Sequence, residues 1–152
     1  MRDVTEGDLP IFFEHQRDSD ANRMASFPAR DRDAFMAHWS RIMADPTVLV
    51  QTILVEEQVA GNIVSWEAED RRFVGYWIGK DWWGRGVASA GLAVFLARVP
   101  ARPLYARVAK DNIASIRVLE KCGFTLCSGL TESLPAPSDG VEELVFGLGG
   151  IR

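Results

Sequence analysis

The sequence predicts an α+β fold (mixed α/β) in which helices cover both faces of a central, mostly antiparallel mixed sheet. Three β-rich runs at residues 48–56, 59–66 and 73–79 follow one another with short polar turns between them, which indicates an antiparallel meander. Residues 73–108 then alternate strand, helix and strand, which predicts a parallel, right-handed βαβ unit. Because helical patterns precede the meander, we expect all these elements to form the layers of one domain spanning residues 1–152.

The N-terminal third is predicted to be mostly helical. A short first strand is expected at residues 1–5, and the amphipathic helix at residues 9–17 has a proline in its first turn, a position that suits this residue. Residues 18–28 are polar and predict a second, short helix. Residues 31–44 carry apolar side chains at helical spacing, and Pro46 ends this helix.

The C-terminal half alternates helices with strands. Pro100 and Pro103 end the helix that follows the meander. Asp111 is the expected N-cap of the next helix, and Gly123 suits the position just after its end. A proline-containing loop precedes the last strand. The elements expected here are a helix at 87–98, a strand at 104–108, a helix at 112–121, and strands at 124–128 and 141–148.

Composition and charge narrow the classes of function. The formal net charge of -4 disfavours nucleic acid or an anionic membrane as the main partner. Cys122 and Cys127 form neither a disulfide framework nor a zinc-ligand pattern, so we expect reduced thiols and no bound metal. Because we find neither an apolar signal segment nor a run long enough to cross a bilayer, the expected location is cytoplasmic.

The segment Trp83-Gly84-Arg85-Gly86-Val87-Ala88 carries the strongest functional signal, because it begins a helix without a capping residue. Ser, Thr, Asp and Asn are the usual caps, and none of them stands at residues 83–86. The first N–H groups of a helix have no partner within it, and the helix dipole places positive charge there. The segment therefore predicts a site for a phosphate-bearing ligand.

Two common phosphate-binding loops fit this segment poorly. A Walker A loop needs Gly-Lys-Ser/Thr, and no lysine precedes Ser89. A dinucleotide fingerprint needs G-x-G-x-x-G/A, of which only Gly84 and Gly86 are supplied, and no acidic residue follows about 20 positions later. A dinucleotide-dependent oxidoreductase is therefore the weaker reading.

A third template fits better. Gly86 and Ala88 match the acetyl-CoA loop of the GNAT N-acetyltransferases, whose usual form is Gln/Arg-x-x-Gly-x-Gly/Ala. Residues 112–124 resemble the later motif of that family, Asn-x-x-Ala/Ser…Glu-Lys-x-Gly-Phe, and follow at the right distance. Trp83 stands where Gln or Arg is usual, as in the branch that resembles ribosomal-protein N-terminal acetyltransferases. The resemblance implies a GNAT-like fold with a parallel, splayed strand pair.

The resemblance also implies acetyl-CoA as cosubstrate and a set of residues that bind it. Backbone N–H groups from Arg85 to Ser89 would hold the pyrophosphate, and the strand containing Tyr76 would pair with the pantetheine arm and bind the acetyl carbonyl oxygen. The cofactor-binding residues implied are Trp77, Ile78, Gly79, Gly84, Arg85, Gly86, Val87, Ala88, Ser89 and Asn112.

The expected catalytic residues are Ser115, Glu67 and Glu69. Ser115 would donate a proton or a hydrogen bond to the leaving thiolate, because Leu119 stands where many GNAT enzymes have a tyrosine acid. Glu67 and Glu69 are candidates for the base that deprotonates the amine, although a solvated charged turn is the simpler reading of both. His15 and His38 could also act as bases.

The predicted function is transfer of an acetyl group to a primary amine, either a protein N-terminus or a small molecule, by direct attack. The alternative is a non-catalytic acyl-CoA-binding regulatory module. The N-terminal helices are expected to wall the acceptor pocket, and a homodimer is plausible by resemblance. The expected lining residues are Met24, Phe27, Phe35 and Trp39.

Overall fold

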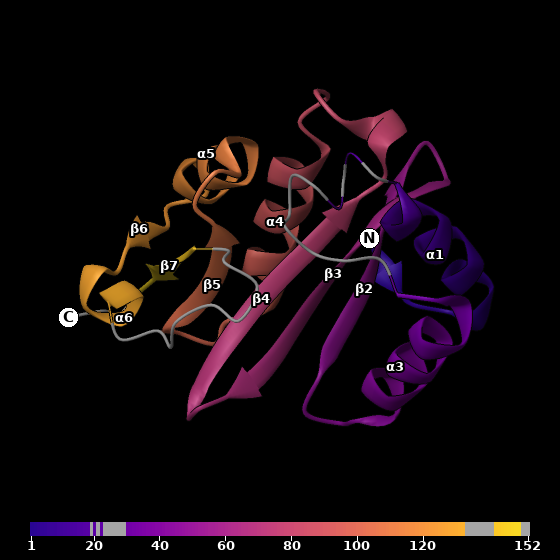
Figure 1. Cartoon of the computed structure of the whole chain (residues 1–152), viewed down its shortest axis with the longest axis horizontal. Helices are drawn as coiled ribbons and strands as arrows, with labels where there is room; N and C mark the ends of the chain where they lie inside the picture. Colours follow the sequence, from indigo (N-terminus) through magenta and orange to yellow (C-terminus); the bar gives the residue numbers. More distant parts are fainter. Residues whose placement is uncertain (19, 21, 23–29, 133–141, 150–152) are drawn as a thin grey trace.

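The fold is built on one seven-stranded sheet with the strand order β1-β2-β3-β4-β5-β7-β6 (Figure 1). The computed structural model describes residues 1–18, 20, 22, 30–132 and 142–149. The strands are β1 (Arg2–Asp3), β2 (Leu49–Val55), β3 (Gln58–Ala68), β4 (Arg71–Ile78), β5 (Leu104–Ala109), β6 (Thr125–Leu126) and β7 (Glu143–Leu148). The helices are α1 (Leu9–Arg17), α3 (Arg32–Ala44), α4 (Val87–Arg98), α5 (Ile113–Lys121) and α6 (Ser128–Glu132), with 3-10 turns η1 (Glu6–Asp8) and η2 (Lys80–Trp82).

Parallel pairing occurs at one place in this sheet, between β4 and β5. These strands are in register only at Phe73↔Tyr105, whereas β3 and β4 pair antiparallel along their length, from Ala68↔Arg71 to Gly61↔Ile78. Beyond Phe73 the two parallel strands separate, and α4 makes the connection between them (Figure 1). The predicted mixed sheet with a splayed parallel pair is confirmed.

Two apolar layers cover opposite faces of the sheet. Ile63 packs with Leu92 and Phe95 of α4, whereas its neighbour Val64 packs against a cluster containing Phe12 of α1 and Trp39 of α3. Successive side chains of a strand point to opposite faces, so α4 lies on one face and α1 and α3 on the other. Helices on both faces were predicted, and this is confirmed.

Most elements begin and end close to their predicted bounds. α1 and α4 coincide with the predicted ranges, because a proline and a pair of glycines mark their starts. The N-cap of α5 is Asn112 and not Asp111, since the Asn112 side chain accepts from the Ser115 N–H. The turn η2 and the helix α6 were not predicted. The second short helix expected at residues 18–28 lies largely outside the described residues.

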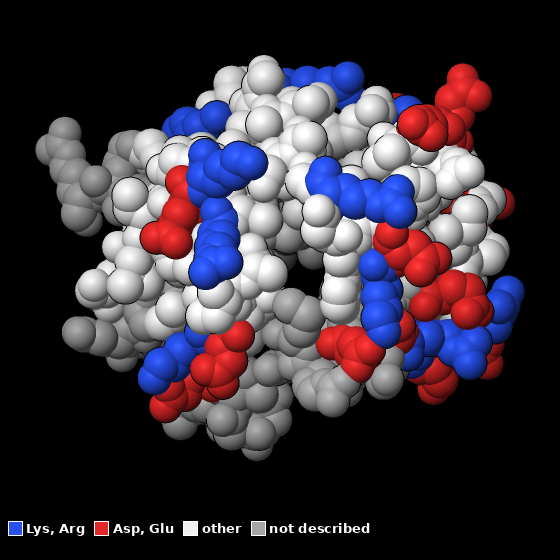
Figure 2. Space-filling view, turned by 90° about the horizontal axis from the view of Figure 1, so that it is seen from above, with Lys and Arg blue, Asp and Glu red and all other residues white. Residues whose placement is uncertain are grey.

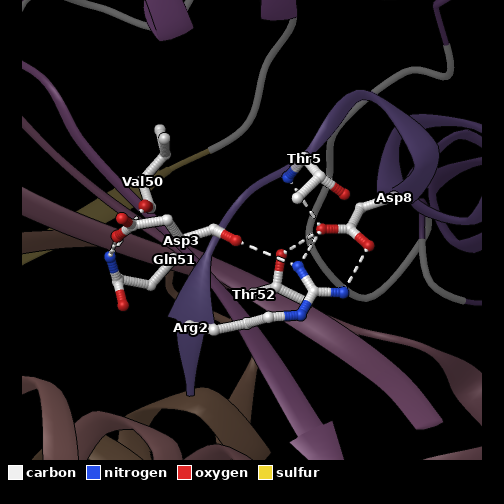
Figure 3. Close-up of polar contacts among 7 residues, drawn as sticks. All are labelled: Arg2, Asp3, Thr5, Asp8, Val50, Gln51 and Thr52. Carbon is white, nitrogen blue, oxygen red and sulfur yellow. Dashed lines mark hydrogen bonds and ion pairs between the residues drawn. The ribbon is translucent and has the colours of Figure 1, made fainter.

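An ion pair between the half-exposed Arg2 and the buried Asp8 joins the first strand, the first turn and the sheet (Figure 3). Asp8 is only 3% exposed, and its carboxylate accepts two hydrogen bonds from the Arg2 guanidinium, at 2.7 and 2.8 Å. It also accepts from the Thr5 N–H at 3.0 Å and from the Thr52 hydroxyl at 2.7 Å. Hydrogen bonding to Arg2 is the main reason why the pKa of Asp8 lies well below its ordinary value. The pair fixes the start of α1 against β2.

None of the described helices is long and apolar enough to cross a membrane.

Replacing Asp8 by Asn should destabilise the protein. The variant keeps the side-chain shape but removes the charge that Arg2, Thr5 and Thr52 share, so we expect the free energy of unfolding to fall by about 2 kcal/mol at neutral pH. Chemical denaturation measures this loss. Asp3→Asn is the matched control, because Asp3 is exposed and its carboxylate accepts from Gln51 at the surface. Equal effects of the two substitutions would contradict this account.

The ion pair of Asp8 also predicts how the stability of the protein depends on pH. The pKa of Asp8 is lowered on folding, so its contribution is present above the unfolded-state pKa of about 4 and disappears as the pH falls towards the lowered value. The difference in unfolding free energy between wild type and Asp8→Asn should therefore narrow between about pH 5 and about pH 2.

Candidate active site

The separation of β4 from β5 leaves a cavity of about 340 Å³, a size within the range of small-molecule sites, about 300–1,000 Å³. No carboxylate, imidazole, ammonium or guanidinium group lines it in the described part of the chain. Figure 2 shows a hollow flanked largely by uncharged residues, with charged side chains gathered around it. The lining residues come from β4, η2, the following turn, α4 and α5: Tyr76, Trp77, Ile78, Trp82, Trp83, Gly84, Gly86, Val87, Ala88, Ser89, Asn112, Ala114, Ser115 and Val118.

The first turn of α4 opens onto this cavity without a cap. Gly86 is the N-cap residue and adopts a left-handed conformation with φ of 73°, and no side chain accepts from the helix start. The helical hydrogen bonds begin with the Ala90 N–H, which donates to the Gly86 carbonyl at 3.0 Å. The N–H groups of Val87, Ala88 and Ser89 precede it and have no acceptor within the helix. With no acidic residue in the first turn, this end of α4 favours an anion.

Trp83 joins the turn before α4 to the end of β4. Its indole N–H donates to the Ile78 carbonyl at 3.0 Å, so the turn cannot shift without breaking this contact. The neighbouring Trp82 ring lies under the Arg85 guanidinium, 5.3 Å from ring centroid to Cζ. Arg85 therefore stands beside the cavity mouth on an aromatic support and is not part of the lining.

The main chain of β4 presents polar groups to the cavity at alternate residues. The Gly79 N–H donates to the Ala60 carbonyl of β3 at 2.8 Å, so the main chain of Trp77 also faces β3. The N–H and carbonyl groups of Tyr76 and Ile78 consequently face the splay, where β5 does not pair with them. Of the three predicted pantetheine-pairing residues, Ile78 directs its main chain there, and Trp77 is also among the lining residues although its indole points to the α1 face.

Ser115 and Asn112 meet at the start of α5, as their spacing predicts. The Asn112 Oδ1 accepts from the Ser115 N–H at 3.2 Å, so this side chain caps the helix while it lines the cavity. The Ser115 Oγ lies 2.7 Å from the Tyr76 hydroxyl. Burial raises the pKa of Tyr76 to about 12, so its hydroxyl is protonated at neutral pH. Leu119 is buried in the core beneath this pair, with 1% of its surface exposed.

Glu67 and Glu69 lie at the other end of the β3–β4 hairpin. Glu67 pairs with Arg72, at 3.3 Å, and Glu69 occupies the turn with a positive φ of 52°. Glu67 lies six positions along β3 from Gly61, which pairs with Ile78, and this spacing corresponds to about 20 Å along a strand. The structure therefore does not bring these carboxylates to the cavity.

His15 lies close to the cavity end of β4, on the face covered by α1. A Cβ atom on Gly79 would lie 2.5 Å from His15 Nε2, so glycine leaves the room that this imidazole occupies. The main-chain carbonyl of His15 accepts from the indole N–H of Trp77 at 3.2 Å. Burial lowers the pKa of His15, which the Asp81 carboxylate opposes, and Nδ1 is buried without a partner among the described residues.

Other predicted positions fall outside the cavity. Phe35 and Trp39 were expected to line an acceptor pocket, but both are core residues with 3% and 5% of their surface exposed. Their rings pack against Phe13 and Phe12, because the apolar stripe of α3 faces α1 and the sheet. Met24 and Phe27 lie outside the described residues. No group of three or more potential metal ligands occurs in the part of the chain that the structure describes.

The Tyr76 hydroxyl is the functional group that sequence reasoning missed, since only the main chain of this residue was considered. Alternation along the strand places Tyr76 on the same face as Val74 and Ile78, which is the face that α4 and α5 cover. This signal was available in the sequence. The contact with Ser115 could not be predicted in this way, because the two residues are 39 positions apart in the sequence.

Comparisons with known proteins agree with this geometry. The family model of the acetyltransferase (GNAT) domain matches residues 1–125. No curated protein sequence matches the chain. A spermidine N-acetyltransferase from Vibrio cholerae in complex with CoA and spermine superposes with a TM-score of 0.79, at 15% identity over 97% of this chain and 92% of that chain.

Two further solved structures share the fold. RimL, a ribosomal-protein alpha-N-acetyltransferase in complex with coenzyme A, has a TM-score of 0.79 at 17% identity over 97% of this chain and 91% of its own. The microcin self-immunity acetyltransferase MccE in complex with acetyl-CoA and AMP has a TM-score of 0.71 at 15% identity, over 93% of this chain and 87% of its own. These likenesses concern the fold alone. Because the family model covers well over half of the sequence, the chain belongs to the GNAT acetyltransferase family.

Proposed function

We propose that the protein transfers the acetyl group of acetyl-CoA to a primary amine by direct attack. One observation carries this proposal. The same uncharged cavity adjoins an uncapped helix start at α4, main-chain groups of β4 that have no strand partner, and a hydroxyl pair from β4 and α5. A pyrophosphate, an amide-bearing arm and a thioester would find complementary groups there in that order.

The proposed cosubstrate site uses the main chain more than side chains. The amides of Val87, Ala88 and Ser89, with those of the glycine-containing turn before them, would bind the pyrophosphate. Ile78 would pair with the pantetheine arm as an added strand would. The Asn112 amide nitrogen is available for the same arm, since only its oxygen is used in capping. The full proposed set is Trp77, Ile78, Gly79, Gly84, Arg85, Gly86, Val87, Ala88, Ser89 and Asn112.

The proposed chemistry needs an oxyanion donor and a group for the leaving sulfur. A main-chain N–H of β4 that faces the splay would stabilise the negative charge on the acetyl oxygen, a contact typically worth about 3 kcal/mol. Ser115 would donate a hydrogen bond to the sulfur as the carbon–sulfur bond breaks and its electron pair passes to sulfur. The thiolate is a fair leaving group, because thiol pKa values lie near 8.5.

The base is proposed to be His15. Among the ionisable candidates it is the one that contacts the cavity end of β4, and its lowered pKa leaves it neutral and able to accept a proton at neutral pH. Its position on the α1 face, opposite α5, would let the amine approach from the side away from the leaving sulfur. Glu67 and Glu69 are about 20 Å from this end of the hairpin. Glu67 forms an ion pair with Arg72, and Glu69 lies in the turn between β3 and β4.

The proposed acceptor is a primary amine, which is a chemical class and not a single compound. Two of the solved structures named above are acetyltransferases of spermidine and of a ribosomal protein, and a primary amine is common to both substrates. The proposed branch, which resembles the ribosomal-protein N-terminal acetyltransferases, is supported by the presence of Trp83 in the loop, whose indole N–H donates to the Ile78 carbonyl at 3.0 Å. Either a protein N-terminus or a small amine fits this proposal.

One observation favours a second function, a non-catalytic acyl-CoA-binding module. The cavity lining contains no basic side chain among the described residues, and His15 reaches the site from outside it. A protein with this lining could bind the cosubstrate without activating an amine.

Turnover and binding measured together separate these functions. We expect the protein to bind CoA in calorimetry and to acetylate at least one member of a panel containing spermidine and peptides with free N-termini. Free thiol release and product mass report the transfer. Binding without transfer to any amine would support the module, and the absence of CoA binding would contradict both functions.

Gly86→Val should weaken CoA binding while the fold is kept. A β-branched residue is strained at the φ of 73° that Gly86 adopts, although a Cβ there meets no neighbouring atom, so the strain falls on the turn that presents the α4 amides. We expect a loss of CoA affinity of about tenfold or more, measured by calorimetry. Gly129→Val is the control, because Gly129 has open space around it and lies away from the cavity. Unchanged CoA affinity in a folded Gly86→Val protein would argue against the proposed loop.

His15→Gln should change the pH dependence of turnover. The pKa of His15 is lowered by burial, so the imidazole is a neutral base above that value and activity falls as the pH drops through it. We expect the variant to lose the acidic limb of the kcat/KM profile and to turn over more slowly at neutral pH. His38→Gln is the matched control, because burial also lowers the pKa of His38 but it lies on α3, near Arg30 and Arg41. An unchanged acidic limb in His15→Gln would exclude this base.

A further inference from the structure

We propose that Tyr76 is a positioning residue that donates its hydroxyl hydrogen to Ser115, so that the single Ser115 hydroxyl hydrogen points into the cavity towards the leaving sulfur. This inference rests on the proposed acetyl transfer and adds to it a residue that neither the motifs nor the family resemblance indicates. CoA binding, acetyl transfer and the positioning role of Tyr76 are measured separately, so that any one of them can be contradicted alone.

Two parts of the fold hold this pair in place. Tyr76 comes from the cavity end of β4 and Ser115 from the first turn of α5, and both line the cavity. The Tyr76 ring packs against the core cluster on the α4 and α5 face, which also includes Ile78 and Val118. Ser115 is fixed through its own N–H, which donates to Asn112. The 2.7 Å distance between the hydroxyl groups is typical of a strong O–H···O hydrogen bond.

Counting donors and acceptors limits the arrangement of the hydrogens. Each hydroxyl has one hydrogen to donate and can accept two bonds. The Tyr76 oxygen has two acceptors within reach, the Ser115 Oγ at 2.7 Å and the Ser115 carbonyl at 3.3 Å. If Ser115 donated to Tyr76, its only hydrogen would be used in that bond and would not be available to a ligand. If Tyr76 donates to Ser115, that hydrogen remains free for a ligand.

A negative charge in the cavity selects the second arrangement. When the carbon–sulfur bond breaks, its electron pair passes to sulfur, and a hydroxyl hydrogen aimed at sulfur stabilises that charge. A donor that itself accepts a hydrogen bond is polarised and becomes a stronger donor, so Tyr76 increases the contribution of Ser115. No cationic side chain lines the cavity in the described part of the chain, so none competes with this hydroxyl for the charge on sulfur.

Tyr76 acts here without giving up its proton. Its pKa is raised to about 12, whereas a thiol has a pKa near 8.5, so complete proton transfer from tyrosine to the thiolate is unfavourable by more than about a thousandfold. The sulfur therefore leaves as a hydrogen-bonded thiolate and takes its proton from solvent. The proton that the amine loses goes to the proposed base. Leu119 has no hydroxyl group, so the hydroxyl that hydrogen-bonds to Ser115 is that of Tyr76 on β4.

Steady-state kinetics on Tyr76→Phe, Ser115→Ala and the double variant provide the first test. We expect Tyr76→Phe to lower kcat by about fivefold to tenfold, with the KM for acetyl-CoA within about twofold of wild type, because the lost hydrogen bond acts on the leaving group. The double variant should be no slower than Ser115→Ala alone, since Tyr76 acts through Ser115. Tyr105→Phe is the matched control, because Tyr105 is the other tyrosine of the chain and lies in a separate cluster. Wild-type kcat in a folded Tyr76→Phe protein, or effects that multiply in the double variant, would overturn the proposal.

The pKa of the CoA thiol in the binary complex provides a second test that does not need turnover. Thiolate absorption in an ultraviolet pH titration should give a lower pKa for bound CoA than for free CoA. Both Tyr76→Phe and Ser115→Ala should raise it, the second by more. A thiol pKa that is the same in wild type and Tyr76→Phe would refute the positioning role even if the protein proves to bind CoA without transferring acetyl groups. Failure to bind CoA at all would refute the proposed function and this inference together.

Discussion

Parallel strands that pair at a single position determine the rest of this architecture. β4 and β5 meet in register only at Phe73 and Tyr105, and the polar main-chain groups of β4 that face β5 beyond that point have no strand partner. A parallel pair also requires a crossover, and the crossover helix α4 begins at Val87, a short turn after β4 ends at Ile78. The same topology therefore opens the sheet and delivers an uncapped helix start to the opening. The cavity is a direct product of strand order and direction.

Contacts at both ends keep the splay in this form. At the narrow end, Phe73 and Tyr105 lie with ring centroids 6.1 Å apart in a cluster that includes Val145 and Cys127. At the open end, the Trp83 indole holds the Ile78 carbonyl. Apolar packing on the α4 face and the ion pair of Asp8 near the start of α1 fix the layers on either side. Stability and site geometry thus depend on the same elements.

The cavity offers a favourable environment for an anion without a charged side chain in its described lining. Main-chain N–H groups at the helix start supply the positive potential, and the charged residues that Figure 2 shows lie around the hollow. This arrangement suits a chain with a formal net charge of -4, since the attraction is local to one helix end. A lining free of charges also strengthens the hydrogen bonds made inside it, including that between Tyr76 and Ser115.

The sequence by itself determined the features that act within a few residues. The open start of α4 and the spacing of Asn112 and Ser115 follow from local sterics and hydrogen bonding, which operate over one turn. Only the tertiary structure decided which distant groups meet. Tyr76 reaches Ser115 across 39 residues, and Glu67 lies at the far end of its hairpin, because strand register and the approach of α5 to the sheet set those distances. Such contacts depend on how whole elements pack together, and no local pattern in the chain encodes that packing.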